Sequence, residues 1–171
     1  MDGRVQARRR RPAEPDAVTI RQAGASDAGA VHALIRALAV YEKLEDKFQA
    51  GVADIAALLD SGACSALLVE HGTEAVGLAL YYPTVLTFAG KRGLWLEDLF
   101  VQPDHRGKGH GLALLKALAR ITVEGGYGAL EWNVLDWNTP SIDFYGQIGA
   151  EPQHGWTDQR LTGDALSALA A

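Results

Sequence analysis

The chain has 171 residues, of which 48% are hydrophobic and 22% are charged. At roughly 150 residues per domain this length predicts one domain, and the composition is typical of a globular protein rather than a disordered or fibrous one. One cysteine, Cys64, excludes an internal disulfide. We therefore expect a reducing, cytoplasmic setting and interpret Cys64 as a small buried hydrophobic side chain.

The net charge of -5 is unevenly distributed. Residues 1–16 hold five arginines against three acidic residues, a balance of +2, which leaves -7 for residues 17–171. We expect residues 1–17 to form a disordered basic arm. It is either a tether to nucleic acid or membrane, or it has no binding function and is an unstructured extension or the result of a start codon placed too far upstream. A basic run without aromatic residues favours the second, and the acidic remainder predicts cationic small molecules rather than nucleic acid as partners.

Membrane insertion and export are both unsupported by the sequence. The longest uncharged run, between Glu74 and Lys91, is interrupted by Pro83 and is too short to cross a bilayer. The N-terminus lacks the apolar region of a signal peptide. We expect no membrane partner.

Apolar spacing and turn residues predict alternating strands and helices after residue 17. In chain order, we predict a strand at 18–20, a helix capped by Ser26 or Asp27 that ends after 41–44, a helix at 52–59, strands at 66–70, 75–82 and 94–101, a helix near Leu112 that Gly125 and Gly126 end, a strand at 129–135, a helix at 139–148, a strand at 155–161, and a short helix capped by Thr162. This order predicts an α/β fold, an open mixed β-sheet flanked by helices, with one domain over 18–171. The hairpin across 71–74 argues against a fully parallel, doubly wound sheet.

A glycine-rich loop, Gln102-Pro-Asp-His-Arg-Gly-Lys-Gly-His-Gly111, joins the strand at 94–101 to the next helix. Glycines at alternate positions let the backbone approach a bulky anion, and unpaired amides at a helix start attract phosphate. Arg106 and Lys108 add positive charge. The loop therefore predicts a diphosphate site.

Other interpretations of this loop fit less well. A Walker loop requires Ser or Thr after its lysine, but Gly109 follows Lys108. A dinucleotide fold is favoured by Glu131, which lies 20 residues after Gly111, but basic residues within the loop are foreign to that fingerprint. His105 and His110 lack a third nearby ligand, so we expect no metal.

Residues 101–111 resemble the acetyl-coenzyme A pyrophosphate loop of the GNAT N-acetyltransferases, Arg/Gln-x-x-Gly-x-Gly/Ala, with His110 where family members usually carry an aliphatic residue. Residues 96–101 and 135–145, Gly149-Ala150, and Tyr41-Glu42 are similar to the diamine branch of that family, the spermidine/spermine and thialysine N-acetyltransferases. The likeness runs from about Val18 to the last residues.

This resemblance implies an acetyl-CoA-dependent N-acetyltransferase. It would transfer an acetyl group directly to the primary amine of a small cationic acceptor, which is a diamine, a polyamine or a thialysine-like amino acid. Two alternatives stay open: a protein acetyltransferase for lysine or N-terminal amines, and a catalytically silent acyl-CoA-binding module. The family's habit implies a homodimer.

Direct transfer requires a neutral amine, although an alkylammonium with a pKa of about 10.4 is almost fully protonated at neutral pH. We predict that Glu97 holds the ammonium and receives its proton, on a strand face shared with Trp95, Leu99 and Val101; the alternative is a paired structural charge. The resemblance implies that Tyr145 protonates the departing thiolate. From the residues alone, a core aromatic beside Phe144 is the simpler interpretation.

The remaining implied contacts fall into two sets. Coenzyme contacts are implied for the backbone of an exposed strand edge, the glycine loop and the start of the helix at 139–148, which together comprise Leu99, Phe100, Val101, Arg106, Gly107, Lys108, Gly109, His110, Gly111, Leu112, Asn138, Ser141 and Tyr145. Acceptor contacts are implied for Tyr41, Glu42, Glu97, Glu131, Trp132, Asn133 and Asp136. Trp137 and Trp156 are further candidates for lining this pocket, with a core role as the alternative.

Overall fold

A computed structural model describes residues 18–155 and 157–171. The predicted basic arm at 1–17 and Trp156 lie outside the described residues. The chain divides into two compact units, the first ending at Asn133 and the second beginning at Val134, and each unit is described by itself below. The boundary of a domain at 18–171 stays a prediction.

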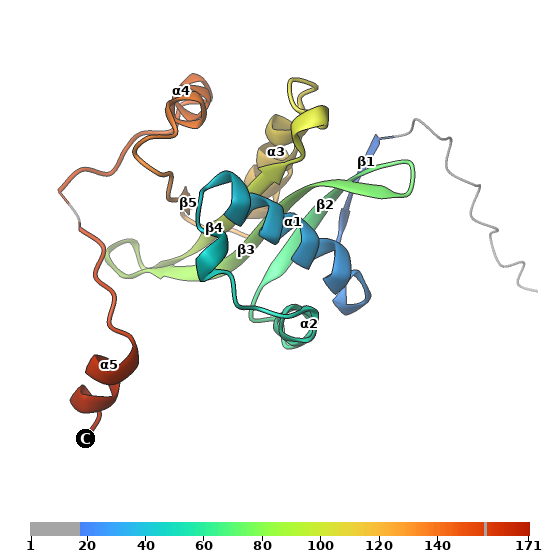
Figure 1. Cartoon of the computed structure of the whole chain (residues 1–171). Coiled ribbons are helices and arrows are strands. Elements are labelled where there is room, and N and C mark those ends of the chain that lie inside the picture. Colours follow the sequence, from blue (N-terminus) through green and yellow to red (C-terminus); the bar gives the residue numbers. More distant parts are fainter. Residues whose placement is uncertain (1–17, 156) are drawn as a thin grey trace, which may run out of the picture. The chain divides into compact units, whose positions relative to one another are not determined.

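The first unit is built on one open five-stranded sheet (Figure 1). The strands lie in chain order, β1 (Val18–Gln22), β2 (Ser65–His71), β3 (Glu74–Leu86), β4 (Lys91–Val101) and β5 (Leu130–Trp132). The first four are antiparallel to their neighbours, and β5 is parallel to β4. The predicted open mixed sheet is confirmed, and so is the hairpin between β2 and β3.

Helices cover both faces of this sheet. The first two, α1 (Ala28–Tyr41) and α2 (Val52–Asp60), share an apolar cluster with Leu68, Leu78 and Phe100. The third, α3 (His110–Glu124), contacts β2, β3 and β4 through the opposite face, where Leu67 lies beside its residues. Successive strand residues point to opposite faces, so Leu67 and Leu68 belong to different layers. Cys64 is buried in the α1 and α2 layer, as predicted.

The centre of β4 contains a β-bulge that the sequence pattern did not predict. Asp98 pairs with Leu80, whereas Leu96 pairs with Tyr81, so Glu97 is one extra residue in β4 without a partner in β3. An extra residue reverses the alternation of side chains along a strand.

The bulge overturns the predicted arrangement of this strand. Because directly paired residues share a face, Asp98 and Phe100 lie on the same face as Leu80, the face covered by α1 and α2. Leu99 and Val101 therefore face the other layer. The prediction that they share one face with Trp95 and Glu97 is wrong, since it assumed strict alternation across the bulge.

The second unit contains α4 (Thr139–Gln147) and α5 (Gly163–Leu169). The strand predicted at 155–161 is wrong for residues 157–161, which have no regular structure and are exposed. Thr157 to Arg160 are four consecutive polar residues, so the segment has no apolar face to bury against a sheet. Thr162 caps α5 as predicted.

Close packing between β3 and β4 makes Gly93 a sensitive position. A Cβ atom there would lie 2.6 Å from Thr84 Oγ1 and 3.2 Å from Leu86 Cγ. We expect Gly93→Ala to lower the free energy of unfolding by about 1–3 kcal/mol, the typical cost of overpacking. Urea denaturation followed by circular dichroism measures it.

Gly29→Ala is the matched control, because no atom lies within 4 Å of a Cβ added at this position in α1. It should leave stability unchanged or raise it by up to about 1 kcal/mol, as an alanine does in a helix. Equal stabilities of the Gly93 and Gly29 variants would contradict this account of the β3 and β4 packing.

Candidate functional site

Strand β4 separates from β5 beside the bulge. The described pairing with β5 involves Leu94, Trp95 and Leu96, while pairing with β3 continues as far as Val101. Along residues 97–101 the side of β4 that is turned away from β3 is therefore an open strand edge. An extended ligand can pair with such an edge as an added strand does. The predicted backbone contacts of Leu99, Phe100 and Val101 lie here.

The glycine loop follows directly and leads into α3. Gly107 and Gly109 have φ values of 71° and 81°, in the left-handed region that glycine adopts without strain. Gly109 caps α3 without a side-chain hydrogen bond, and the first helical amide bond runs from Ala113 N–H to the Gly109 carbonyl. The amides that precede Ala113, including those of His110, Gly111 and Leu112, therefore have no carbonyl partner within the helix, which is the arrangement that attracts anions.

Arg106 links this loop to the end of α1. Its Nε donates to the Val101 carbonyl at 2.9 Å, and its guanidinium carbon lies 4.6 Å from the centre of the Tyr41 ring. Lys108 Nζ donates to the Asp104 carbonyl at 3.0 Å. Tyr41, predicted as an acceptor contact, thus lies against a residue predicted to bind phosphate. The structure brings the two predicted sets together at this point.

Glu97 is exposed at the bulge and is held by two aromatic donors. Tyr82 Oη and Trp95 Nε1 each donate to Glu97 Oε2 at 2.9 Å. Desolvation, followed by the hydrogen bond to Glu97, raises the pKa of Tyr82 to about 12, so the phenol stays a donor at neutral pH. Both of these bonds are made to Oε2 rather than to Oε1. Tyr82 and Trp95 were not predicted as site residues.

Asp98 is the half-buried carboxyl of the site, and sequence reasoning missed it. Burial, together with the charges of Glu97 and Glu42, raises the pKa of Asp98 to about 7. Burial also raises the pKa of Glu42, and that of Cys64 rises through burial and the charge of Asp98. A carboxyl that titrates near neutrality suits proton transfer. Its sequence signal was the pair Glu97-Asp98 within an apolar strand, where strict alternation would direct the two carboxyls to opposite faces.

Three predicted acceptor residues lie at or beside β5. Glu131 pairs with Trp95 and Trp132 with Leu96, so Glu131 shares the face of Trp95 in the neighbouring strand. Both side chains are half-buried, and Asn133 is exposed at the end of the unit. Glu131 thus belongs to the same region of the sheet as the bulge.

The other predicted residues lie in the second unit. Asn138 is buried and caps α4, where its carbonyl accepts from Ser141 N–H at 3.0 Å. Tyr145 is half-buried, and its ring centre lies 5.5 Å from that of Phe144. Asp136 and Trp137 are exposed in the segment that precedes α4. Within this unit Asn138, Ser141 and Tyr145 therefore share one helix.

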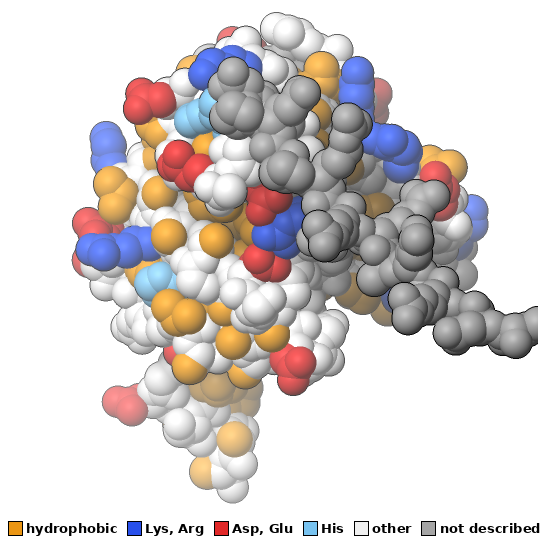
Figure 2. Space-filling model, turned by 90° about the vertical axis from the view of Figure 1, so that its right-hand side faces the viewer, with side chains coloured by type: hydrophobic (Ala, Val, Ile, Leu, Met, Phe, Trp, Pro, Cys, Tyr) orange, Lys and Arg blue, Asp and Glu red, His pale blue; other side chains and the backbone are white. Residues whose placement is uncertain are grey.

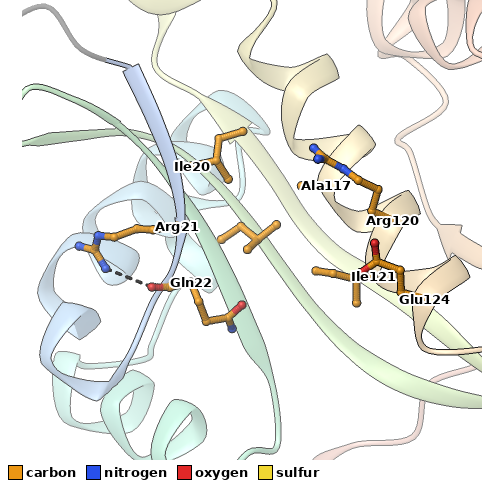
Figure 3. Close-up of a pocket in the computed structure, with 8 residues that line it drawn as sticks. Ile20, Arg21, Gln22, Ala117, Arg120, Ile121 and Glu124 are labelled. Carbon is orange, nitrogen blue, oxygen red and sulfur yellow. Dashed lines mark hydrogen bonds between the residues drawn. The ribbon is translucent and has the colours of Figure 1, made fainter.

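A surface pocket of about 360 Å³ lies elsewhere in the first unit, between β1, β2 and the C-terminal half of α3 (Figure 3). None of its lining residues was predicted as a site residue. Its one basic side chain from β1, Arg21, is already paired, with Asp27 and Glu70 each 2.7 Å away.

In residues 18–155 and 157–171, no group of three or more His, Cys, Asp or Glu side chains is arranged to hold a metal ion. No helix in those ranges combines the length and the apolar character that a bilayer crossing requires.

On the face shown in Figure 2, acidic and basic side chains are interspersed among hydrophobic ones.

Comparison with known proteins gives consistent matches. The acetyltransferase (GNAT) family matches residues 29–150. Thialysine N-epsilon-acetyltransferase of Bos taurus is 35% identical over 166 residues, which cover 90% of this chain and 97% of that protein. L-ornithine N5-acetyltransferase NATA1 of Arabidopsis thaliana is 44% identical over 93 residues, 54% of this chain and 41% of that protein. Among solved structures, an integron cassette protein from the mobile metagenome of V. cholerae aligns with a TM-score of 0.75 and 26% identity, covering 90% of this chain and 97% of that one.

Proposed function

Because this chain belongs to the acetyltransferase (GNAT) family, we propose that it transfers the acetyl group of acetyl-CoA to a primary amine of a small diamine, a polyamine or a thialysine-like amino acid. The more general assignment, that the chain is an acetyltransferase acting on amines, rests on its relatives. The choice of a small cationic amine as acceptor rests on the half-buried Asp98 carboxyl, beside Glu97 and Glu42, where β4 separates from β5.

The acyl carrier is proposed to bind along the open edge of β4 and the glycine loop. Its diphosphate would accept from the first amides of α3, with Arg106 and Lys108 supplying positive charge. Its amide-bearing arm would pair with the backbone of residues 97–101 as an added strand. When bound, the carrier supplies an acetyl group activated as a thioester.

The acceptor is proposed to bind at the three carboxyls. Glu97, fixed through Oε2 by Tyr82 and Trp95, presents Oε1 to the ammonium. Asp98 takes the proton, because a carboxyl with a pKa of about 7 exists partly as the base at neutral pH. Removing a proton from an alkylammonium at neutral pH costs about 4 kcal/mol. The nearby negative charges hold the cation in place until its proton has been transferred. Glu42 and Glu131 would extend the acidic surface toward the far amine of a diamine.

The neutral amine then attacks the thioester carbonyl carbon. A C–N bond forms as the C–S bond breaks, and the departing thiolate receives a proton from Tyr145 Oη. The nitrogen of the new amide loses one proton to solvent, and a proton from solvent restores the Tyr145 phenol. A phenol with an ordinary pKa near 10 is matched to a thiol near 8.5, so this transfer needs little adjustment. Asn138 and Ser141, at the start of the same helix, are proposed to contact the carrier.

A substrate panel tests this proposal. Thiol release from acetyl-CoA is followed with spermidine, thialysine, ornithine, a lysine peptide and a peptide with a free N-terminus. The proposal requires that at least one small cationic amine is turned over with a higher kcat/KM than either peptide. Preference for a peptide would establish protein acetylation instead, and binding of acetyl-CoA without turnover of any amine would indicate a silent binding module.

The left-handed backbone at Gly109 gives a prediction about carrier binding. Alanine is strained at a φ of 81°, by about 1–2 kcal/mol, and the strain would shift the amides that follow. We expect Gly109→Ala to weaken binding of CoA by about tenfold, measured by isothermal titration calorimetry.

The control is Gly111→Ala, because φ at position 111 is not in the left-handed region and no atom lies within 4 Å of an added Cβ. Position 111 is also Gly or Ala in the pattern that the loop resembles. Equal affinity of the Gly109 variant and the wild type would show that the loop backbone does not determine carrier binding.

A further inference from the structure

Three half-buried histidines from separate segments meet beside the glycine loop. His71 is the last residue of β2, His105 ends the 3-10 turn Pro103–His105, and His110 is the first residue of α3. The ring centres of His71 and His105 are 5.4 Å apart, and those of His105 and His110 are 6.5 Å apart. We call these residues the histidine cluster.

The surroundings of His110 disfavour its charged form when no ligand is bound. Burial and the positive charges of His105, Lys108 and His71 lower the pKa of His110. His110 also stands at the N-terminal end of a helix, where the helix dipole disfavours a cation. The groups whose charges act on His110 come from β2, the 3-10 turn and the loop, and Lys108 is the permanent cation among them. The nearby acidic residues are Glu74, which pairs with His71 across the β2–β3 hairpin, and Asp104, which precedes His105 in the turn.

An anion bound at the loop would reverse this balance. A phosphate oxygen near the cluster favours the imidazolium form, since opposite charges stabilise each other in a half-buried setting. Binding would then be accompanied by proton uptake, and affinity would rise as the pH falls. The described residues hold no group of His, Cys, Asp or Glu arranged for a metal, so a metal does not account for the three imidazoles.

We propose that His71 and His105 join His110, which the resemblance already implies as a coenzyme contact, in binding phosphate groups of the acyl carrier through their imidazoles, and that the cluster takes up a proton when these groups bind. This inference rests on the proposed function, because it takes the glycine loop to be the carrier site. It adds to that function a group of side chains outside the backbone cradle. It also assigns a purpose to His110, which stands where the resembled family usually has an aliphatic residue.

The test is isothermal titration calorimetry with dephospho-CoA, which retains the diphosphate but lacks the phosphomonoester. A phosphomonoester itself titrates near pH 6 and would obscure the result. Titrations at about pH 6 and about pH 8, the range in which histidine titrates, are repeated in buffers of different ionisation enthalpy to count protons. We expect binding up to about tenfold tighter at the lower pH, the effect of a pKa rise of about one unit, together with proton uptake.

The variant His71→Gln/His105→Gln/His110→Gln should lose this pH dependence, whereas His154→Gln, which changes an exposed histidine of the second unit, should retain it. NMR titration of the wild-type imidazoles with and without dephospho-CoA avoids dependence on folding of the variant, and the pKa of at least one cluster residue should rise in the complex. Binding with equal affinity at both pH values and no proton uptake overturns this inference and leaves the proposed function standing. Absence of binding at both pH values overturns this inference and the proposed function.

Discussion

Asp98→Asn should reduce kcat for amine acetylation by at least about a hundredfold, the usual contribution of a positioned general base. The amide keeps the size of the side chain but cannot accept the proton. In the wild type, kcat/KM should rise with pH through about 7, because the base form of Asp98 is required and its pKa is about 7. A pH-rate profile for wild type and variant measures both effects.

The same substitution should stabilise the protein. Because the pKa of Asp98 rises from 3.8 to about 7 on folding, its contribution to stability is complete below 3.8 and is lost as the pH rises to about 7. Asparagine has no such loss, so the variant should be more stable than the wild type by up to about 4 kcal/mol above pH 7 and by little near pH 4. Urea denaturation at several pH values measures this difference.

Together, the two readouts separate catalysis from folding. Lower activity with higher stability at neutral pH is expected from loss of a strained catalytic carboxyl. Lower activity with lower stability would instead identify Asp98 as a structural carboxyl whose hydrogen bonds hold the bulge. Unchanged activity would remove Asp98 from the mechanism, and Glu97→Gln would then test the proton acceptor predicted from the sequence.

Tyr145→Phe should lower kcat by about a hundredfold or more while leaving the affinity for CoA within about threefold. The variant keeps the ring beside Phe144 and removes the hydroxyl that we propose protonates the thiolate. Single-turnover thiol release measures the chemical step, and calorimetry measures CoA binding. An acyl donor with a more acidic thiol should recover part of the lost rate, since it needs less help to depart.

Tyr127→Phe provides the matched control. Its ring lies against Arg92, with 4.9 Å between the guanidinium carbon and the ring centre, and this contact survives loss of the hydroxyl. The control should retain full activity. Full activity of the Tyr145 variant as well would leave the thiolate to be protonated by solvent and would return Tyr145 to the alternative role of a packed aromatic.

The residues that act through local backbone were predictable from the sequence. Gly107, Gly109 and the start of α3 follow from short-range rules, since the space left by a missing Cβ and the unpaired amides of a helix start depend on adjacent residues. The strand and helix order was predictable for the same reason as far as α4. The prediction of a strand failed at residues 157–161, which contain four polar residues and one apolar residue.

Several expectations stay predictions: the role of Glu97, the coenzyme and acceptor residues, the homodimer and the cytoplasmic location. The relation of Tyr145 to the carboxyls stays a prediction as well, because residue spacing along the chain does not fix it. Long-range packing determines where such a side chain lies, and the local residue pattern does not predict that packing.

The sequence by itself determined the α/β order, the anion-binding loop and the resemblance to amine acetyltransferases. The tertiary structure alone decided which carboxyl is half-buried and which is exposed, because one extra residue in β4 turns Asp98 toward α1 and leaves Glu97 exposed between Tyr82 and Trp95. It also decided that His71, 34 positions before His105 in the chain, lies beside it. A bulge and a contact between distant segments depend on how strands pair in three dimensions, and residue spacing along the chain does not fix that pairing.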